Sequence, residues 1–187
     1  MTDSTAPTAT PPGSPAPRKL RFATIDDAIA EADRLADAER GGRLQQLGNW
    51  TLGQALGHIA TWAEFAHDGY PDSVRAPLPV RLVIHVMRNR ILTGGLMPGV
   101  RLRNIPDGTL GTAVLPTQEG LDRFRAALRA LAATPPAIVN PVFGRLSHEQ
   151  WIQLNLRHAE LHLGFLVPRA VAASSIAGER GAGSVQH

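Results

Sequence analysis

Hydrophobic residues recur every three to four positions over most of residues 20–166, which is the spacing of amphipathic helices. No convincing run alternates apolar and polar residues in the way that a half-buried strand does. The pattern predicts five helices, over residues 25–40, 51–66, 80–92, from near 117 to before 135, and 147–166. The expected fold class is therefore all-α.

Local signals support the starts of three of these helices. The Thr24 hydroxyl can accept hydrogen bonds from the free amides of the first turn that follows it. Thr51 with Gln54, and Ser147 with Gln150, have the spacing of a capping box. We therefore expect defined N-terminal caps at all three positions.

The arrangement of the helices predicts a four-helix bundle with a crossover connection. The connection between the second and fourth helices is long and carries the extra helix at 80–92. Residues 95–116 are rich in Gly and Pro and too numerous for a simple connector, so they could cover an active site or form a small hairpin. The helix over 147–166 is expected to end at Pro168.

The ends of the chain differ in composition from the middle. Residues 1–17 consist mostly of Pro, Ser, Thr and Ala, which predicts a disordered leader. The composition of residues 169–187 likewise predicts a flexible tail. Residues 18–168 are then the helical bundle domain.

Composition excludes several classes of protein. Of the 187 residues, 43% are hydrophobic and 19% are charged, as in a soluble globular domain. The chain has no Cys, which removes thiolate nucleophiles, thiolate metal sites and disulfides. The first residues lack the apolar run of a secretory signal, and the most apolar stretch, 78–97, contains arginines that oppose membrane insertion. We expect a cytoplasmic protein with no membrane segment.

The net charge of +3 is too small to require a polyanionic partner. Six arginines and no acidic residue lie between Arg75 and Arg103, and this segment could attract a small anionic substrate or an acidic partner. Aromatic residues do not alternate with the arginines as they would in a base-stacking surface, so we expect no nucleic acid partner.

Three histidines occupy inward positions on two predicted helices. At 100° per residue, His158 and His162 fall in or beside the apolar stripe of their helix, one turn apart. His58 lies at the edge of the apolar face of the helix over 51–66. Three imidazoles of this kind could bind one divalent ion such as Zn, Ni or Fe and leave positions open for water. The stripe beside His158 and His162 is formed by Trp151, Leu154, Leu161 and Phe165, and the opposite face by Gln153, Arg157 and Glu160.

A less specific interpretation remains for each histidine. An inward His is often a hydrogen-bonded core residue, and an exposed one is often part of a solvated face. Asn155 and Gln54 could orient an imidazole or serve only as core and capping residues, whereas Glu64 and Glu160 are rotated away from the histidines. Of the other histidines, His67 is expected at the surface near a helix C-terminus, His85 on a basic face, and His148 and His187 have no assigned role.

Two strings, LGNWTLGQALGHIATW (47–62) and FGRLSHEQWIQLNLRHAELHLGFL (143–166), resemble the DinB/YfiT-like superfamily of four-helix proteins. The second is most similar to a subfamily known only as a domain of unknown function. The resemblance implies a DinB-like bundle with one divalent metal bound by a His of the second bundle helix and a His-x-x-x-His pair of the last. These positions correspond to His58, His158 and His162.

The resemblance also implies possible activities. Characterised members include metal-dependent transferases and isomerases that use low-molecular-weight thiols, so a metal-dependent transferase or hydrolase with a small anionic or thiol substrate is one hypothesis. The alternative is a non-enzymatic helical bundle, or a homodimer, with a structural histidine cluster. No catalytic residue and no organic cofactor is assigned from the sequence.

Overall fold

The computed structural model describes residues 16–74, 76–99, 105 and 108–169. The predicted leader and tail lie almost entirely outside this range, so the expectations about them stay predictions. The all-α class is confirmed, with one small addition of strand. The described elements are α1 (Ile25–Arg40), β1 (Leu44–Gln46), α2 (Leu52–Asp68), the 3-10 turn η1 (Asp72–Val74), α3 (Leu78–Gly94), α4 (Thr117–Ala133), α5 (His148–Leu163) and β2 (Leu166–Pro168).

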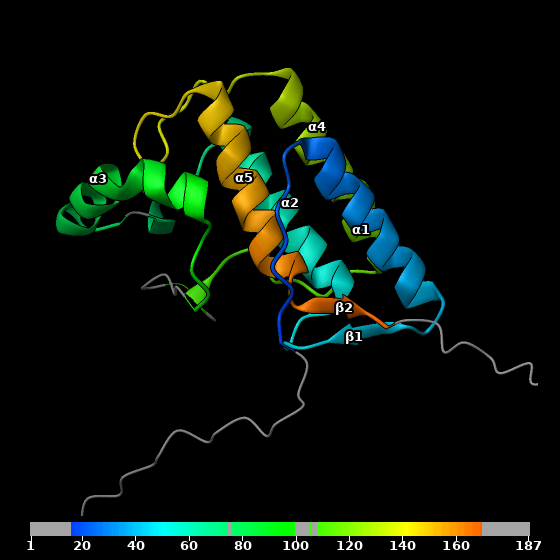
Figure 1. The fold of residues 1–187 in the computed structure, drawn as a ribbon. Helices are drawn as coiled ribbons and strands as arrows, with labels where there is room; N and C mark the ends of the chain where they lie inside the picture. Colours follow the sequence, from blue (N-terminus) through cyan, green and yellow to red (C-terminus); the bar gives the residue numbers. More distant parts are fainter. Residues whose placement is uncertain (1–15, 75, 100–104, 106–107, 170–187) are drawn as a thin grey trace, which may run out of the picture.

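Helices α1, α2, α4 and α5 form a bundle, and α3 lies outside it next to α5 (Figure 1). The connection from α2 to α4 carries α3, which confirms the predicted crossover. The strands β1 and β2 pair antiparallel at one end of the bundle and join the segment after α1 to the end of α5 (Figure 1).

The bundle core is apolar and tightly packed. Leu56 and Ile59 of α2 and Phe124 and Leu128 of α4 are completely buried, and each such side chain stabilises the fold by roughly 1.5–3 kcal/mol. A Cβ added at Gly120 of α4 would lie only 2.6 Å from the carbonyl oxygen of Gly53 in α2. This close approach fixes the position of α2, which carries His58.

The predicted caps are all present. Thr24, Thr51 and Ser147 each accept a hydrogen bond from the backbone amide three residues later, and a side chain at that later position accepts one from the cap amide. Such caps contribute about 1 kcal/mol each. They set where α1, α2 and α5 begin.

The end of α5 differs from the prediction. The helix ends at Leu163, and residues 166–168 form β2, so Pro168 terminates a strand. The cause is Arg18, whose guanidinium donates to the carbonyl oxygens of Leu163 (3.1 Å) and Leu166 (2.9 Å). These bonds satisfy the helix terminus, and β1 offers Leu166 a strand partner instead of another helical turn.

The prediction that the face of α5 opposite the apolar stripe is solvated is also wrong in part. Arg157 and Glu160 are buried, at 5% and 8% exposure, and form an ion pair of 2.8 Å. The extended segment before α1 covers them: the Phe22 amide donates to Glu160 (2.6 Å), and Arg157 donates to the Phe22 carbonyl (2.7 Å). Burial lowers the pKa of Arg157, while the charge of Glu160 opposes that shift.

The apolar stripe of α5 is rotated from its expected position. Leu154 and Leu161 are only half-buried, whereas Leu156, Ala159 and Leu163 are buried in the core. The histidine face of α5 therefore lies at the edge of the core. Among the described residues, no helix is long and apolar enough to cross a bilayer.

Candidate metal centre

The structure brings the three histidines together from α2 and α5. One ring nitrogen from each of His58, His158 and His162 lies within 4.8 Å of the other two. The Nε2 atoms of His58 and His158 are 3.1 Å apart, and the three ring centroids are separated by 4.6–4.9 Å. The convergence expected from helical rotation is therefore present in the fold.

A backbone contact determines the tautomer of His58. Its Nδ1 lies 2.6 Å from the carbonyl oxygen of Leu110, and a carbonyl can only accept a hydrogen bond. The neutral ring thus carries its proton on Nδ1, and the Nε2 lone pair faces the other two histidines. A hydrogen bond of this kind is what orients a metal-binding imidazole.

Burial keeps all three imidazoles neutral near pH 7. Desolvation lowers the pKa of His58 to about 4, although the bond to Leu110 opposes the shift. Desolvation, followed by the neighbouring His58, lowers the pKa of His162 to about 3. The pKa of His158 is also far below its ordinary value, first through burial and then through the other two rings. Neutral rings keep the lone pairs that metal coordination requires.

Two tryptophans border the cluster. Trp50 stacks on His162 with ring centroids 5.0 Å apart and also lies 4.7 Å from the His58 ring. The Trp62 ring lies 6.1 Å from those of His58 and His158. His58 is buried at 2% exposure, but His158 and His162 are only partly buried. Two of the three histidines therefore keep part of their surface exposed, and two aromatic rings border the cluster.

The donor set fits a tetrahedral or five-coordinate divalent ion. Metal–nitrogen bonds of about 2.1 Å at tetrahedral angles place the ligand atoms roughly 3.4 Å apart. The distance of 3.1 Å between the Nε2 atoms of His58 and His158 is already near this value. The His162 nitrogen lies no more than 4.8 Å from the other two ligand atoms, and a small rotation of its ring would shorten these distances. In the described part of the chain, no residue forms a hydrogen bond with the His162 ring, so its nitrogens remain available.

The described end of the segment after α3, residues 108–116, contacts α2 beside the centre. Gln54 donates to the carbonyl oxygen of Thr112 (3.2 Å), which together with the contact from His58 to Leu110 holds the segment against α2. Gly111, with φ of +73°, packs so closely on Thr61 that a Cβ would lie 2.8 Å away. The hairpin considered for this region would fall partly on residues 100–104 and 106–107, outside the described residues.

The other polar candidates have structural roles. Gln54 closes the α2 capping box, and Asn155 donates to the Trp151 carbonyl oxygen (3.0 Å) within α5. Glu64 forms an ion pair with Arg123 of α4 (2.6 Å). None of these side chains orients an imidazole.

The remaining described histidines do not join the cluster. His67 lies in the last turn of α2, as expected, and is half-buried, with its Nε2 buried and without a hydrogen-bond partner among the described residues. His148 bonds to the Leu131 carbonyl oxygen (2.7 Å). His85 is exposed on α3.

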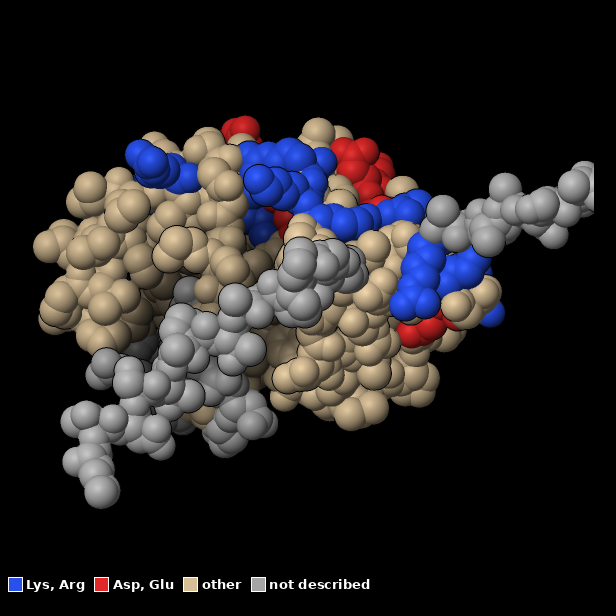
Figure 2. Space-filling model, turned by 60° about the horizontal axis from the view of Figure 1, so that its bottom comes forward, with Lys and Arg blue, Asp and Glu red and all other residues tan. Residues whose placement is uncertain are grey.

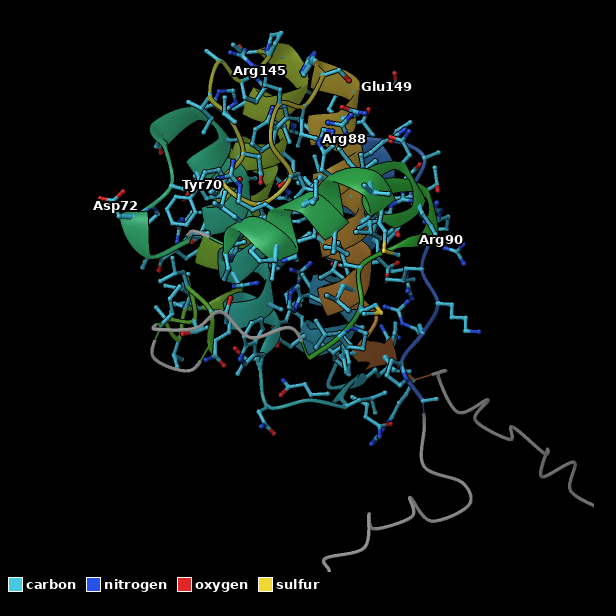
Figure 3. All side chains as sticks on the ribbon, turned by 90° about the vertical axis from the view of Figure 1, so that its left-hand side faces the viewer. Tyr70, Asp72, Arg88, Arg90, Arg145 and Glu149 are labelled. Carbon is cyan, nitrogen blue, oxygen red and sulfur yellow. The ribbon has the colours of Figure 1, made fainter. Side chains whose placement is uncertain are left out.

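The basic segment is only partly described, and its described arginines, Arg81, Arg88 and Arg90, form no hydrogen bond with the three histidines. Arg88 donates to the Arg145 carbonyl oxygen (2.8 Å), on the side of α3 that faces the bundle, whereas Arg90 lies away from this contact (Figure 3). Arg75, Arg101 and Arg103 lie outside the described residues.

Sequence reasoning missed two contributors to the centre. Trp50 was not predicted to belong to the site, yet its ring stacks on that of His162. The Leu110 carbonyl oxygen belongs to the backbone, so the type of residue at position 110 gives no indication of its role. The position of Trp50 next to the Thr51 cap was the one available hint.

Comparison with known proteins identifies the family of this chain. The family model described as "Protein of unknown function (DUF1569)" matches residues 15–169. The sequence matches no curated protein and no solved structure at a significant level. The match covers most of the 187 residues, including all three histidines. The chain belongs to the DUF1569 family, which is part of the DinB/YfiT-like superfamily.

Proposed function

We propose that His58, His158 and His162 bind one divalent metal ion, of the Zn, Ni or Fe type, and that this centre is catalytic. The observation that carries the proposal is the convergence of three neutral ring nitrogens within 4.8 Å. Three protein ligands leave coordination positions open, which is the arrangement of catalytic metal sites. When bound, such an ion lowers the pKa of a coordinated water or thiol and orients a substrate.

The protein's own groups prepare this site. The Leu110 carbonyl oxygen holds the His58 ring in the orientation that directs Nε2 inward. Trp50 restricts the rotation of His162 by stacking on it, and the partial exposure of His158 and His162 leaves a path for a small molecule. The chain thus supplies orientation and restricted access.

The reaction class that we favour is group transfer or hydrolysis on a small anionic or thiol-containing substrate. Because the chain has no Cys, a thiol nucleophile must come from a cosubstrate. Membership of the superfamily supports thiol chemistry as one route.

One observation favours a second candidate, a structural histidine cluster without catalysis. The 3.1 Å contact between His58 and His158 is a hydrogen bond if the His158 ring carries its proton on Nε2, and it then needs no ion. A structural ion would stabilise the fold strongly, so that chelation would lower the melting temperature while no substrate turned over.

The proposal is tested by metal analysis of the purified protein. We expect one equivalent of divalent ion in the wild type and in His85→Ala, which removes an exposed histidine of α3. His158→Ala should lose the ion while keeping its helical content. If the wild type neither contains nor binds a divalent ion, the metal proposal is wrong. If it binds one but no thiol or anionic ester is turned over, the structural role is supported.

A further inference from the structure

A cleft of about 310 Å³ lies between α3, the turn after α2 and the loop before α5. This volume is at the lower end of the range for small-molecule sites. None of the three clustered histidines lines the cleft. The Tyr70 ring at its wall lies 6.1 Å from the ring of Trp62, which in turn borders His58 and His158. The cleft is therefore distinct from the histidine cluster, although an aromatic side chain connects the two.

The loop before α5 fixes Asn140 at the wall of the cleft. Asn140 is 3% exposed, and its backbone amide and carbonyl both pair with Gly144. Its side-chain oxygen accepts hydrogen bonds from the amides of Val142 and Phe143 (2.9 Å each). These two bonds identify the oxygen of the side-chain amide, so the Nδ2 group is the one that donates to the Tyr70 hydroxyl oxygen (3.2 Å). The Tyr70 hydroxyl is thus held by a rigid loop.

The Tyr70 hydroxyl keeps a proton that it can donate. A tyrosine hydroxyl both accepts and donates, and the bond from Asn140 uses only an accepting position. Among the described residues, none accepts the hydroxyl proton. Burial raises the pKa of Tyr70, while the bond from Asn140 opposes that shift, so the hydroxyl stays protonated at neutral pH. The ring itself is stacked on Trp151, with centroids 6.5 Å apart. A group bound in the cleft therefore meets a hydrogen-bond donor in a fixed position.

The cationic group at the cleft is Arg81 of α3. Its guanidinium forms no hydrogen bond or ion pair with any described residue, whereas Arg88 is bonded to the Arg145 carbonyl oxygen. Helix α3 contains no acidic residue, and the left-hand end of the view in Figure 2, where α3 lies, shows basic side chains at its upper edge and no acidic ones. Asp72 also lines the cleft, but it is exposed, already has an interaction partner and points away from Tyr70 in Figure 3. The cleft therefore favours an anion.

We propose that this cleft binds the carboxylate of a small organic acid, with the Arg81 guanidinium and the Tyr70 hydroxyl as the donors. The two oxygens of a carboxylate match these two donors. A phosphate dianion has more acceptor positions than they satisfy, and Asp72 at the rim opposes its second negative charge. Val139 and the half-buried Ile138 provide an apolar wall for the organic part of the ligand. The site depends on neither the histidines nor a metal ion.

The test uses Tyr70, which is the only tyrosine of the chain. Full-length protein carrying ¹³C at the ζ carbon of tyrosine gives a single tyrosine resonance, whose position responds to hydrogen bonding of the hydroxyl. Sodium benzoate at constant ionic strength should shift this resonance saturably. Benzamide has the same shape without the charge and should bind at least about 10-fold more weakly.

Variants of α3 assign the binding to the cleft. Arg81→Gln should raise the Kd for benzoate at least about 10-fold, because it removes the charged donor. Arg90→Gln is the matched control, since Arg90 is an exposed arginine of the same helix that does not line the cleft, and its Kd should equal that of the wild type.

Two further titrations separate the cleft from other anion sites. Addition of EDTA, which removes any metal from the histidines, should leave the benzoate Kd unchanged, and inorganic phosphate should bind more weakly than benzoate. The proposal is overturned if benzoate causes no saturable shift, or if benzamide or Arg81→Gln gives the affinity of benzoate for the wild type. It is also overturned if EDTA abolishes binding, which assigns the anion to the metal centre, or if phosphate binds more tightly than benzoate.

Discussion

The Nδ1–H group of His58 donates a 2.6 Å hydrogen bond to the carbonyl oxygen of Leu110, which ties the candidate ligand on α2 to the segment that follows α3. This bond selects the tautomer and directs Nε2 toward His158 and His162. The geometry of the histidine cluster therefore depends on a backbone position 52 residues away in the sequence.

Substituting Gly111 with alanine tests that dependence. The residue has φ of +73°, and a Cβ there would meet Thr61 at 2.8 Å, so the segment must shift and withdraw the Leu110 carbonyl oxygen. Loss of such a supporting bond costs about 10–100-fold in metal affinity. We expect a weakening of this size for Gly111→Ala in a chelator competition assay.

Gly99→Ala provides the control for backbone strain. Gly99 also has a positive φ, +81°, but a Cβ there meets nothing within 4 Å. The metal affinity of Gly99→Ala should match that of the wild type. Equal affinity in Gly111→Ala and Gly99→Ala would show that the Leu110 contact does not support the site.

The stacking of Trp50 on His162 predicts a fluorescence signal. A paramagnetic ion such as Ni²⁺ quenches nearby indoles, and Trp50 lies 5.0 Å from the His162 ring. Titration with Ni²⁺ should quench the wild type, and Trp50→Phe should lose a large part of the quenching amplitude. Trp151→Phe should retain it, because Trp151 is next to Tyr70 on the far side of Trp62. Retained quenching in Trp50→Phe would place the ion elsewhere.

The buried ion pair between Arg157 and Glu160 predicts a stability effect. Glu160→Gln removes the charge and leaves Arg157 buried without a counterion, which costs about 3–5 kcal/mol of the free energy of unfolding. Denaturant unfolding measures the loss. Glu149→Gln, at an exposed position of the same helix, should change the free energy of unfolding by no more than about 0.5 kcal/mol. A similar small change in both variants would contradict the buried pair.

The cap of α1 predicts a pH dependence. Hydrogen bonds with Thr24, first with its backbone amide and then with its side chain, lower the pKa of Asp27 below its ordinary value of 3.8. A lowered folded-state pKa means that the stabilisation is present above pH 3.8 and is lost as the pH falls through the lower value. Asp27→Asn should therefore be less stable than wild type at neutral pH, and the difference should shrink in acid.

Denaturant unfolding at neutral and acidic pH measures this difference. Asp26→Asn is the control, because Asp27 and not Asp26 closes the capping box. A stability gap for Asp27→Asn that does not depend on pH would contradict the assignment.

Much of the fold and centre was predictable because the signals are local. The pairs Thr51 with Gln54 and Ser147 with Gln150 are three residues apart, so the sequence alone shows the caps. His158 and His162 are one turn apart on α5, and helical rotation places them on a common face.

The errors arise where distant segments meet. The sequence near Leu163 does not show that Arg18 will bind the end of α5, and nothing near Glu160 shows that the Phe22 backbone will cover it. The contact of Leu110 with His58 likewise depends on the path of the crossover. The exposure of Leu82, Val83 and Val86 on α3 could not be predicted for the same reason, because periodicity does not show which helix lies outside the bundle.

The most direct measurement is X-ray absorption at the zinc edge of zinc-loaded protein, which counts the imidazole ligands and gives their distances. We expect three imidazole nitrogens at about 2.0–2.1 Å, with oxygen ligands completing the shell, and a reduced imidazole count in His158→Ala. A zinc ion with one imidazole or none, or a spectrum that His158→Ala leaves unchanged, would contradict the shared centre of His58, His158 and His162.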